Sequence, residues 1–293
     1  MHDKIVLITG ANSGIGFVAA RELAKRGARV VMICRDAGRG ARARHEIAQV
    51  AAGRPPELFL ADLSSQTSLR ALAGDIRERL PHIDVLINNA GGMFARRELT
   101  AEGIEKTFAT NHLGPFLLTN LLLDLVCAAP AGRIVNLAAE SPLARLDFDN
   151  LQGEKRYGFL SAYFRSKLEN IIFTFDLARR LEGTGVTVNC LSPGPSRTRF
   201  GDGMTGLPGL FPRLKIFFPS AEKGARTLIH LASSPEVADV TGQFFLWQKI
   251  RKTKPVMRDV DVAARLWHVS AGLVGLPAEP KIEPRRAALE KAR

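Results

Sequence analysis

The sequence is poor in cysteine and has no long apolar run. Its 293 residues include only three cysteines, an odd number that is too small for a disulfide framework and fits a reducing compartment. No stretch of about 18 consecutive apolar residues occurs, which argues against a transmembrane helix. The first residues, Met-His-Asp-Lys, do not have the architecture of a signal peptide. We therefore expect a cytoplasmic protein without a membrane anchor.

Acidic residues are also scarce. There are 29 Asp and Glu against 41 Lys and Arg, which gives a net charge of +12. Such a charge suits a phosphorylated ligand, an anionic membrane or nucleic acid, but no nucleic-acid recognition element is present. The histidines are scattered without further ligands at suitable spacing, so we predict no catalytic metal; they include His45, His112, His230 and His268.

Short apolar runs alternate with helical patterns along most of the chain. We predict seven buried strands, at 5–8, 30–34, 58–61, 85–87, 134–138, 186–191 and 243–246. Strands that alternate with helices predict an α/β fold of the Rossmann type, a doubly wound parallel sheet with helices on both faces. No linker interrupts the alternation, so residues 1–276 form one predicted domain and 277–293 a charged, Pro-containing tail.

The helices of this domain have clear signals at three places. The stretch 15–26 carries an apolar stripe and is followed by Gly27, a residue well placed to end a helix. A longer helix is predicted at 160–181, with apolar residues at helical spacing. A C-terminal helix is predicted at about 260–275.

A glycine-rich turn joins the first predicted strand to the first predicted helix. Glycines let a backbone approach a pyrophosphate closely, and the amide groups of the following helix N-terminus can bind it. This position in the chain makes the turn a strong cofactor-binding signal, although such a turn alone is a weak one. The predicted binding residues are Gly10, Asn12, Ser13, Gly14, Ile15 and Gly16.

The end of the second strand bears on the choice of cofactor. An acidic residue there would bind the ribose hydroxyls of NAD, but the sequence has Cys34 followed by Arg35. A guanidinium at this place would bind a 2′-phosphate, so we predict NADP(H) with Arg35 as a ligand. Arg39 and Arg42 either join Arg35 or form a solvated basic helix face.

Polar residues follow the third and fourth strands as well. Asp62, with Leu63 beside it, would contact the adenine, or Asp62 would cap the next helix, the better reading of that residue alone. Asn89, Ala90 and Gly91 follow the fourth strand, where a ligand crevice lies outside the carboxyl ends of the strands.

Tyr163 and Lys167 are four residues apart and therefore lie on one face of the predicted long helix. A free tyrosine has a pKa of about 10, and a neighbouring ammonium lowers it. Such a pair can exchange a proton with a substrate oxygen while a nicotinamide exchanges hydride. A pair at this spacing also occurs by chance on ordinary helix surfaces.

Taken together, these segments resemble the short-chain dehydrogenase/reductase family. The family's motifs stand in its order: TGANSGIG at 9–16, NNAG at 88–91, YFRSK at 163–167 and PG at 193–194. The resemblance covers about residues 4–275. It implies that Asn111 supports a proton relay and that Lys167 lowers the pKa of Tyr163 and holds the ribose. It also implies that Pro193, Gly194 and Thr198 lie against the nicotinamide, and that the protein is a homodimer or homotetramer.

Finer features are similar to the retinol dehydrogenase-like branch of that family. They are the segments at 111–123, 150–174 and 264–276, and a long insertion between the fifth strand and the tyrosine. The branch resemblance implies lipophilic alcohols, aldehydes or ketones as substrates. Segment 199–220, rich in glycine, proline and large apolar residues, would be the substrate lid and would also allow peripheral membrane contact.

One position departs from the family pattern. Ala139 occupies the place of the catalytic serine, and losing one such donor typically costs about 10²–10³ in rate. Ser141, two residues on, would face the same side of an extended segment and replace it. Alternatively, a water, a backbone amide or a substrate group replaces the donor. The remaining readings are a non-redox reaction that uses the same Tyr-Lys pair, or a cofactor-binding module without catalysis.

Overall fold

The computed structural model describes residues 1–142, 144–194 and 220–279. Its centre is one eight-stranded sheet in the order β3-β2-β1-β4-β5-β6-β7-β8. The strands are β1 (Ile5–Thr9), β2 (Arg29–Cys34), β3 (Glu57–Leu60), β4 (Val85–Asn88), β5 (Arg133–Leu137), β6 (Thr187–Ser192), β7 (Gln243–Leu246) and β8 (Lys249–Ile250). All neighbours are parallel except β7 and β8. The predicted doubly wound sheet is confirmed.

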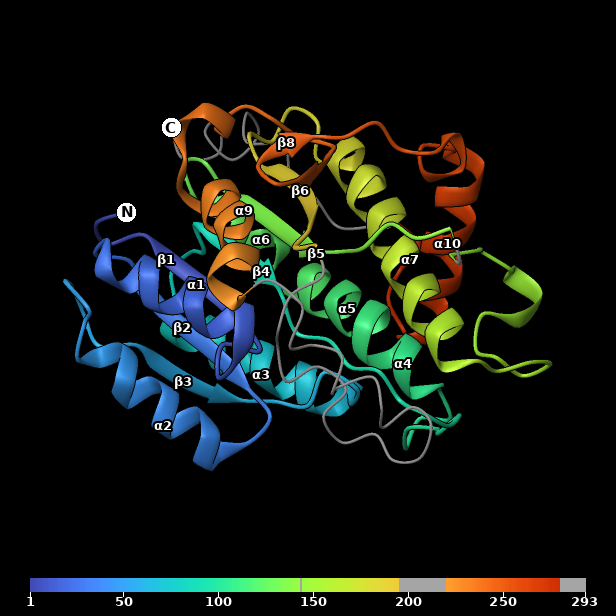
Figure 1. The fold of residues 1–293 in the computed structure, drawn as a ribbon, viewed down its shortest axis with the longest axis horizontal. Coiled ribbons are helices and arrows are strands. Elements are labelled where there is room, and N and C mark those ends of the chain that lie inside the picture. Colours follow the sequence, from blue (N-terminus) through green and yellow to red (C-terminus); the bar gives the residue numbers. More distant parts are fainter. Residues whose placement is uncertain (143, 195–219, 280–293) are drawn as a thin grey trace.

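The strands are rich in apolar residues because helices cover both faces of the sheet. Alternate residues of β1 belong to different cores: Ile5 and Leu7 to one, Val6 and Ile8 to the other. One face is covered by α1 (Gly14–Lys25), α2 (Ala37–Ala48) and α9 (Ala221–Ser233) (Figure 1).

The other face is covered by α3, α5, α6, α7 and α10 (Figure 1). Their bounds are α3 (Gln66–Arg79), α5 (Gly114–Leu121), α6 (Leu123–Ala128), α7 (Phe159–Arg180) and α10 (Val260–Leu273). A short helix α4 (Lys106–Phe108) and a π-helical turn η1 (Ala109–Leu113) lead into α5. Three 3-10 turns, η2 (Phe148–Asn150), η5 (Pro235–Val237) and η6 (Pro255–Met257), complete the described elements. The helix predicted at 160–181 corresponds to α7. Gly27, predicted to end the first helix, follows α1 and has φ +80°.

The prediction of seven strands was wrong by one. Lys249 and Ile250, which follow the last predicted strand, form β8 and pair antiparallel with β7. The turn between them is Trp247-Gln248, and both residues have positive φ, 53° and 62°. Two positive φ values define the tight hairpin turn that sequences usually mark with Asn-Gly. Trp-Gln carries no such mark, so the hairpin was missed.

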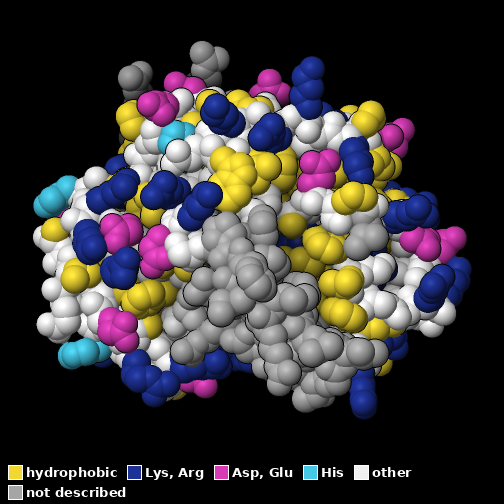
Figure 2. All heavy atoms as spheres, viewed as in Figure 1, with side chains coloured by type: hydrophobic (Ala, Val, Ile, Leu, Met, Phe, Trp, Pro, Cys, Tyr) yellow, Lys and Arg dark blue, Asp and Glu magenta, His cyan; other side chains and the backbone are white. Residues whose placement is uncertain are grey.

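Among the described residues, no helix is both long and apolar enough to cross a membrane. The predicted lid at 199–220 and the predicted tail at 277–293 lie almost entirely outside the described residues. Figure 2 shows Lys and Arg side chains spread over the described part of one face, with acidic side chains among them. The positive charge on this face is therefore distributed over several helices.

Candidate active site at the carboxyl ends of the strands

The sheet reverses its winding direction at β1, which pairs with β2 on one side and β4 on the other. Ligand crevices of doubly wound sheets form at this place, outside the carboxyl ends of the strands. The glycine-rich turn leaves β1 here and the segment 88–91 leaves β4. The topology therefore brings the two predicted cofactor segments together.

The glycine-rich turn and the segment 88–91 are held together by close contacts and hydrogen bonds. Gly10 has φ +70°, and a Cβ on Gly16 would lie 2.3 Å from Asn89 Nδ2 and 2.5 Å from the Gly10 carbonyl oxygen. Asn89 Nδ2 donates to the Thr9 carbonyl at 2.8 Å, while the Thr9 hydroxyl accepts from the amides of Asn89 and Ala90, each at 3.0 Å. Only glycine fits at position 16, because real Cβ atoms do not approach other atoms so closely.

The N-terminus of α1 has the properties of an anion site. Ser13 is its N-cap residue with an extended backbone, and its side chain makes no capping hydrogen bond to the helix. The first turn contains no acidic residue. Backbone N–H groups and the positive end of the helix dipole therefore face the turn without a competing carboxylate on that helix.

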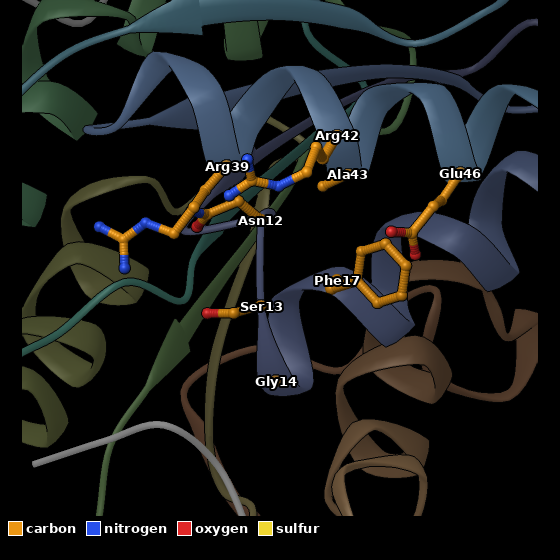
Figure 3. Close-up of a pocket in the computed structure, with 8 residues that line it drawn as sticks. All are labelled: Asn12, Ser13, Gly14, Phe17, Arg39, Arg42, Ala43 and Glu46. Atoms are coloured by element: carbon orange, nitrogen blue, oxygen red, sulfur yellow. The ribbon is translucent and has the colours of Figure 1, made fainter. Parts of the chain in front are cut away.

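A cavity of about 300 Å³ lies between this turn and α2 (Figure 3). Arg39 and Arg42 project toward it from α2, and Phe17 closes the other side. The lining residues are Asn12, Ser13, Gly14, Phe17, Arg39, Arg42, Ala43 and Glu46. Arg42, weighed only as a possible neighbour from sequence, is thus part of the site, and helical spacing from Arg39 was the signal for it.

Arg35 does not line this cavity. Its side chain is exposed at the end of β2, whereas Arg39 and Arg42 lie one and two turns into α2. Asp36 caps α2 by accepting from the Arg39 amide at 2.7 Å, and this bond lowers the pKa of its carboxyl group. Burial raises the pKa of the Cys34 thiol to about 11, so the residue at the NAD-discriminating place is uncharged.

Asp62 does not cap the helix that follows β3, so that expectation was wrong. Its carboxylate accepts from the Ser64 amide at 2.9 Å and from the Ser64 hydroxyl at 2.7 Å. The helix begins four residues later, at Gln66, and Ser65 caps it. The Leu63 side chain is buried in the core, which leaves only its backbone for a ligand.

Tyr163 and Lys167 lie on one face of α7, as their spacing predicts. Lys167 Nζ is 5.8 Å from the centroid of the Tyr163 ring. Lys167 is 4% exposed, and burial lowers its pKa to about 8. Burial raises the pKa of Tyr163, contrary to the expectation that the ammonium lowers it. Withdrawal from water disfavours the charged form of each group, and this burial is the cause of both shifts.

Asn111 completes this group from the π-helical turn η1. Its Oδ1 accepts from the Gly92 amide at 2.7 Å, and its Nδ2 donates to the Gly92 carbonyl at 2.8 Å and the Ser166 hydroxyl at 3.0 Å. Gly91 lies between Asn111 and Lys167: a Cβ on it would be 3.1 Å from Asn111 Oδ1 and 3.2 Å from Lys167 Nζ. The segment 88–91 therefore contacts both the glycine-rich turn and the group formed by Asn111 and Lys167.

Ala139 and Ser141, the two residues weighed for the expected serine position, both follow β5. Ala139 is half-buried just after β5, while Ser141 is 6% exposed and its carbonyl accepts from the Ala144 amide at 3.1 Å. The chain turns at Ser141, which therefore does not continue the straight line of the strand.

The loop after β6 is described only as far as Gly194. Gly194 has φ +69°, and a Cβ there would meet the Trp247 indole at 2.5 Å. Pro193 precedes it, and Thr198 lies outside the described residues. The β7–β8 turn therefore supports the start of this loop directly.

Known proteins resemble this chain over nearly its whole length. Human retinol dehydrogenase 14 is 44% identical, with 94% of this chain and 88% of that protein covered. Human retinol dehydrogenase 13 is 42% identical, with 94% and 86% covered. A crystal structure of a Mycobacterium paratuberculosis protein of unassigned function has a TM-score of 0.75 at 33% identity, with 96% of each chain covered. The family model described as short chain dehydrogenase matches residues 4–205. The chain belongs to the short-chain dehydrogenase family and is retinol dehydrogenase-like.

Proposed function

We propose that the protein is an NADP(H)-dependent oxidoreductase that interconverts a lipophilic alcohol and its aldehyde or ketone. One observation carries this proposal: Gly91 lies against both Lys167 Nζ and Asn111 Oδ1. Gly91 belongs to the same segment as Asn89, which contacts the glycine-rich turn. A cofactor seated on that turn would extend toward the acid–base group. Family membership supports redox chemistry between alcohols and carbonyl compounds.

The residues of the cavity fit a nicotinamide dinucleotide phosphate. Gly10 and Gly16 leave room for a pyrophosphate, and the α1 N-terminus supplies amide donors. Arg39 and Arg42 can bind a 2′-phosphate, and the neutral Cys34 cannot accept the ribose bonds that an NAD-type acid would. The structure of a short chain dehydrogenase from Shigella flexneri, similar in fold with a TM-score of 0.66, is complexed with NADP. When bound, the nicotinamide gives or takes the hydride.

Tyr163 acts as the general acid–base. In the reduction direction its hydroxyl donates a proton to the carbonyl oxygen, and in the oxidation direction it receives the proton of the alcohol. The Lys167 ammonium stabilises the tyrosinate that forms. Asn111 holds the Gly92 backbone at both its N–H and its C=O, which fixes the loop against α7 through Ser166. Lipophilic substrates follow from the similarity to retinol dehydrogenases.

The test is NADPH oxidation with a panel of lipophilic aldehydes and ketones. Tyr163→Phe should lower kcat by about 10²–10⁴-fold, the usual contribution of a general acid–base, with little change in NADPH affinity. Tyr157→Phe is the matched control, because Tyr157 is the other of the two tyrosines and its hydroxyl donates to the Phe94 carbonyl. Full turnover by Tyr163→Phe would overturn the assignment.

The alanine at position 139 favours a second candidate function. A non-redox reaction such as cyclisation, isomerisation or elimination would use Tyr163 and Lys167 with the cofactor retained. It predicts product without net NADPH oxidation, measurable by mass spectrometry of the reaction mixture. A cofactor-binding module without catalysis predicts NADPH binding and no product with any substrate.

Ser141 is proposed to replace the missing hydroxyl donor. Ser141→Ala should then lower kcat by about 10²-fold, the lower end of the cost of one such donor, while NADPH affinity stays constant. Ala139→Ser in the Ser141→Ala background should restore turnover, because it returns the hydroxyl to the family position. Unchanged turnover in Ser141→Ala would remove Ser141 from the mechanism.

We further propose a single domain over residues 1–276, a homodimer or homotetramer, and a cytoplasmic location. The buried thiols of Cys34 and Cys190 fit a reducing compartment. Light scattering of the purified protein would test the assembly, and fractionation of the expressing cells the location.

A further inference from the structure

A buried histidine lies directly beside the catalytic asparagine and has no part in the mechanism above. His112 is 1% exposed and stacks on Phe108, with ring centroids 5.4 Å apart. Phe116 and Phe173 also pack against it, at 6.2 Å and 6.3 Å. Burial lowers its pKa to about 4, so the imidazole is neutral and carries one N–H. Which nitrogen carries the proton depends on its two polar neighbours.

The neighbour of Nδ1 fixes the tautomer. Asn170 Nδ2 donates to the Asn111 carbonyl at 2.9 Å and to the Leu137 carbonyl at 3.3 Å. Carbonyl oxygens only accept, so the amide group must point its NH₂ toward them and its Oδ1 toward His112. The distance from Asn170 Oδ1 to His112 Nδ1 is 3.2 Å. An oxygen that only accepts requires the proton on Nδ1.

The other nitrogen is then an acceptor. His112 Nε2 lies 2.9 Å from the Ser270 hydroxyl oxygen, and Ser270 is fully buried on α10. The hydroxyl must therefore donate to Nε2. The bonds run in one direction, from Ser270 through His112 and Asn170 to the two backbone carbonyls.

The two carbonyls at which this series of hydrogen bonds ends, those of Asn111 and Leu137, lie in the proposed active site. In an α-helix the Asn111 carbonyl would accept from residue 115, but Pro115 has no N–H, so Asn170 supplies the donor. The Leu137 carbonyl, at the end of β5, also accepts from Lys167 Nζ at 3.4 Å. Asn170 therefore contacts the backbone of the catalytic asparagine and shares an acceptor with the catalytic lysine.

We propose that Ser270, His112 and Asn170 are positioning residues that hold the Asn111 backbone and the Lys167 ammonium in place through one directed series of hydrogen bonds. The proposal rests on the proposed function for what Lys167 and Asn111 do. It makes α10, which begins 80 residues after the end of α7, a contributor to the geometry of the active site.

The direction of these hydrogen bonds explains what the loss of the Ser270 hydroxyl would do. Without a donor at Nε2, the imidazole can move its proton to that nitrogen. Nδ1 then presents a lone pair to Asn170 Oδ1, and the amide of Asn170 must turn over to donate to it. The turned amide would point its oxygen at the carbonyls of Asn111 and Leu137, where acceptor faces acceptor.

The first test measures the tautomer and does not depend on turnover. The six histidines are labelled with ¹⁵N in the ring, and two-bond ¹H–¹⁵N spectra are recorded from pH 5 to 8. His112→Asn identifies the His112 signals. We expect a neutral ring protonated at Nδ1 throughout, and a change toward the Nε2 form in Ser270→Ala. A ring protonated at Nε2, or one that titrates near pH 6.5, would overturn the series of bonds even if the enzyme is active.

The second test measures the effect on the site. Ser270→Ala should lower kcat about tenfold, which is the worth of one to two buried hydrogen bonds, and shift the alkaline limb of the pH profile that Lys167 sets. Ser270→Cys keeps a weak donor, so its kcat should lie between those of the wild type and Ser270→Ala. Thr184→Val is the matched control, because it removes another buried hydroxyl far from the site. A profile that does not move in Ser270→Ala would show a merely structural role. If no variant, nor the wild type, turns over substrate, the proposed function fails while the tautomer result stands.

Discussion

The proposed site has a cofactor end, at the glycine-rich turn, and a catalytic end, at Tyr163 and Lys167, and the two hold their residues by different physical means. At the cofactor end, the turn after β1 and the segment after β4 come into close contact because Gly10 and Gly16 have no side chains that would collide with Asn89. At the catalytic end, polar side chains bridge three elements, and Asn111 and Asn170 satisfy backbone groups of neighbouring segments. Close contacts at the first end depend on glycines that have no side chain, whereas the second end depends on buried hydrogen bonds between side chains and backbone.

This difference predicts how each end fails. Adding a methyl group at the cofactor end produces a clash with backbone, which cannot move away cheaply. Removing a polar partner at the catalytic end leaves the fold intact but lets a neighbour turn or shift. The cofactor end should therefore lose binding, whereas the catalytic end should lose rate.

The largest effect is expected from Gly16→Ala. Its Cβ would lie 2.3 Å from Asn89 Nδ2, so the turn must open, and NADPH affinity should fall by more than about 100-fold, roughly 3 kcal/mol. Gly74→Ala is the matched control, since a Cβ there meets nothing within 4 Å, and it should gain about 0.5–1 kcal/mol in stability as a helix substitution. Calorimetric titration and thermal unfolding measure both quantities. Normal NADPH binding by Gly16→Ala would break the comparison.

At the catalytic end, Lys167→Met should separate stability from activity. Burial holds the pKa of Lys167 at about 8, against about 10.4 in an unfolded chain. Below pH 8 the wild type bears the full cost of the buried charge, of order 3 kcal/mol. Between pH 8 and 10.4 only the unfolded chain binds this proton, so stability rises with pH.

The Lys167→Met variant should therefore be more stable than wild type at pH 7 and lose this rise, while kcat falls by at least about 10²-fold. Urea unfolding of both proteins at pH 7 and 9.5 isolates the contribution of Lys167, because all other groups are shared. In wild type, kcat/KM for reduction should decline above pH 8 as the ammonium loses its proton. If Lys167→Met were less stable than wild type at pH 7, interactions in the folded protein would have to offset the cost of burying the Lys167 charge.

The smallest effect is expected at the exposed rim of the cofactor end. Arg39→Ala and Arg42→Ala should each weaken NADPH binding about tenfold and leave NADH binding unchanged, because only NADPH carries the 2′-phosphate. The loss should shrink at high salt, since the charges are exposed. Arg44→Ala, on the same helix but outside the cavity, is the control. If NADPH affinity fell in Arg35→Ala but not in Arg39→Ala or Arg42→Ala, the 2′-phosphate would bind at the end of β2 and not at α2.

The sequence predicted the cofactor end better than the catalytic end, for a physical reason. The glycines needed for close contact, Gly10, Gly14 and Gly16, lie within one short segment, so the local sequence is enough to identify the turn at 9–16. The seven longer strands were also predicted to within a residue or so, because burial in the sheet makes their segments rich in apolar residues.

Features made by partners far apart in the chain could not be predicted. Ser270 reaches His112 across 158 residues, and no local pattern signals that contact. The cavity formed by Arg39 and Arg42 depends on how α2 lies over the turn, which favoured them over Arg35. The pKa of Tyr163 rises because of burial, which a spacing of four residues does not reveal.

The two edges of the sheet also bear on how the protein behaves at high concentration. A sheet edge carries unpaired N–H and C=O groups that can recruit a strand from another molecule. Here one edge is β3, with four residues, and the other is β8, with two. Lys249 of β8 is exposed, and exposed Arg251 and Lys252 follow the strand. The hairpin closed by Trp247 and Gln248 thus ends the sheet in a short, positively charged rim. Two copies that met there would repel one another, and this edge resists growth into an aggregate.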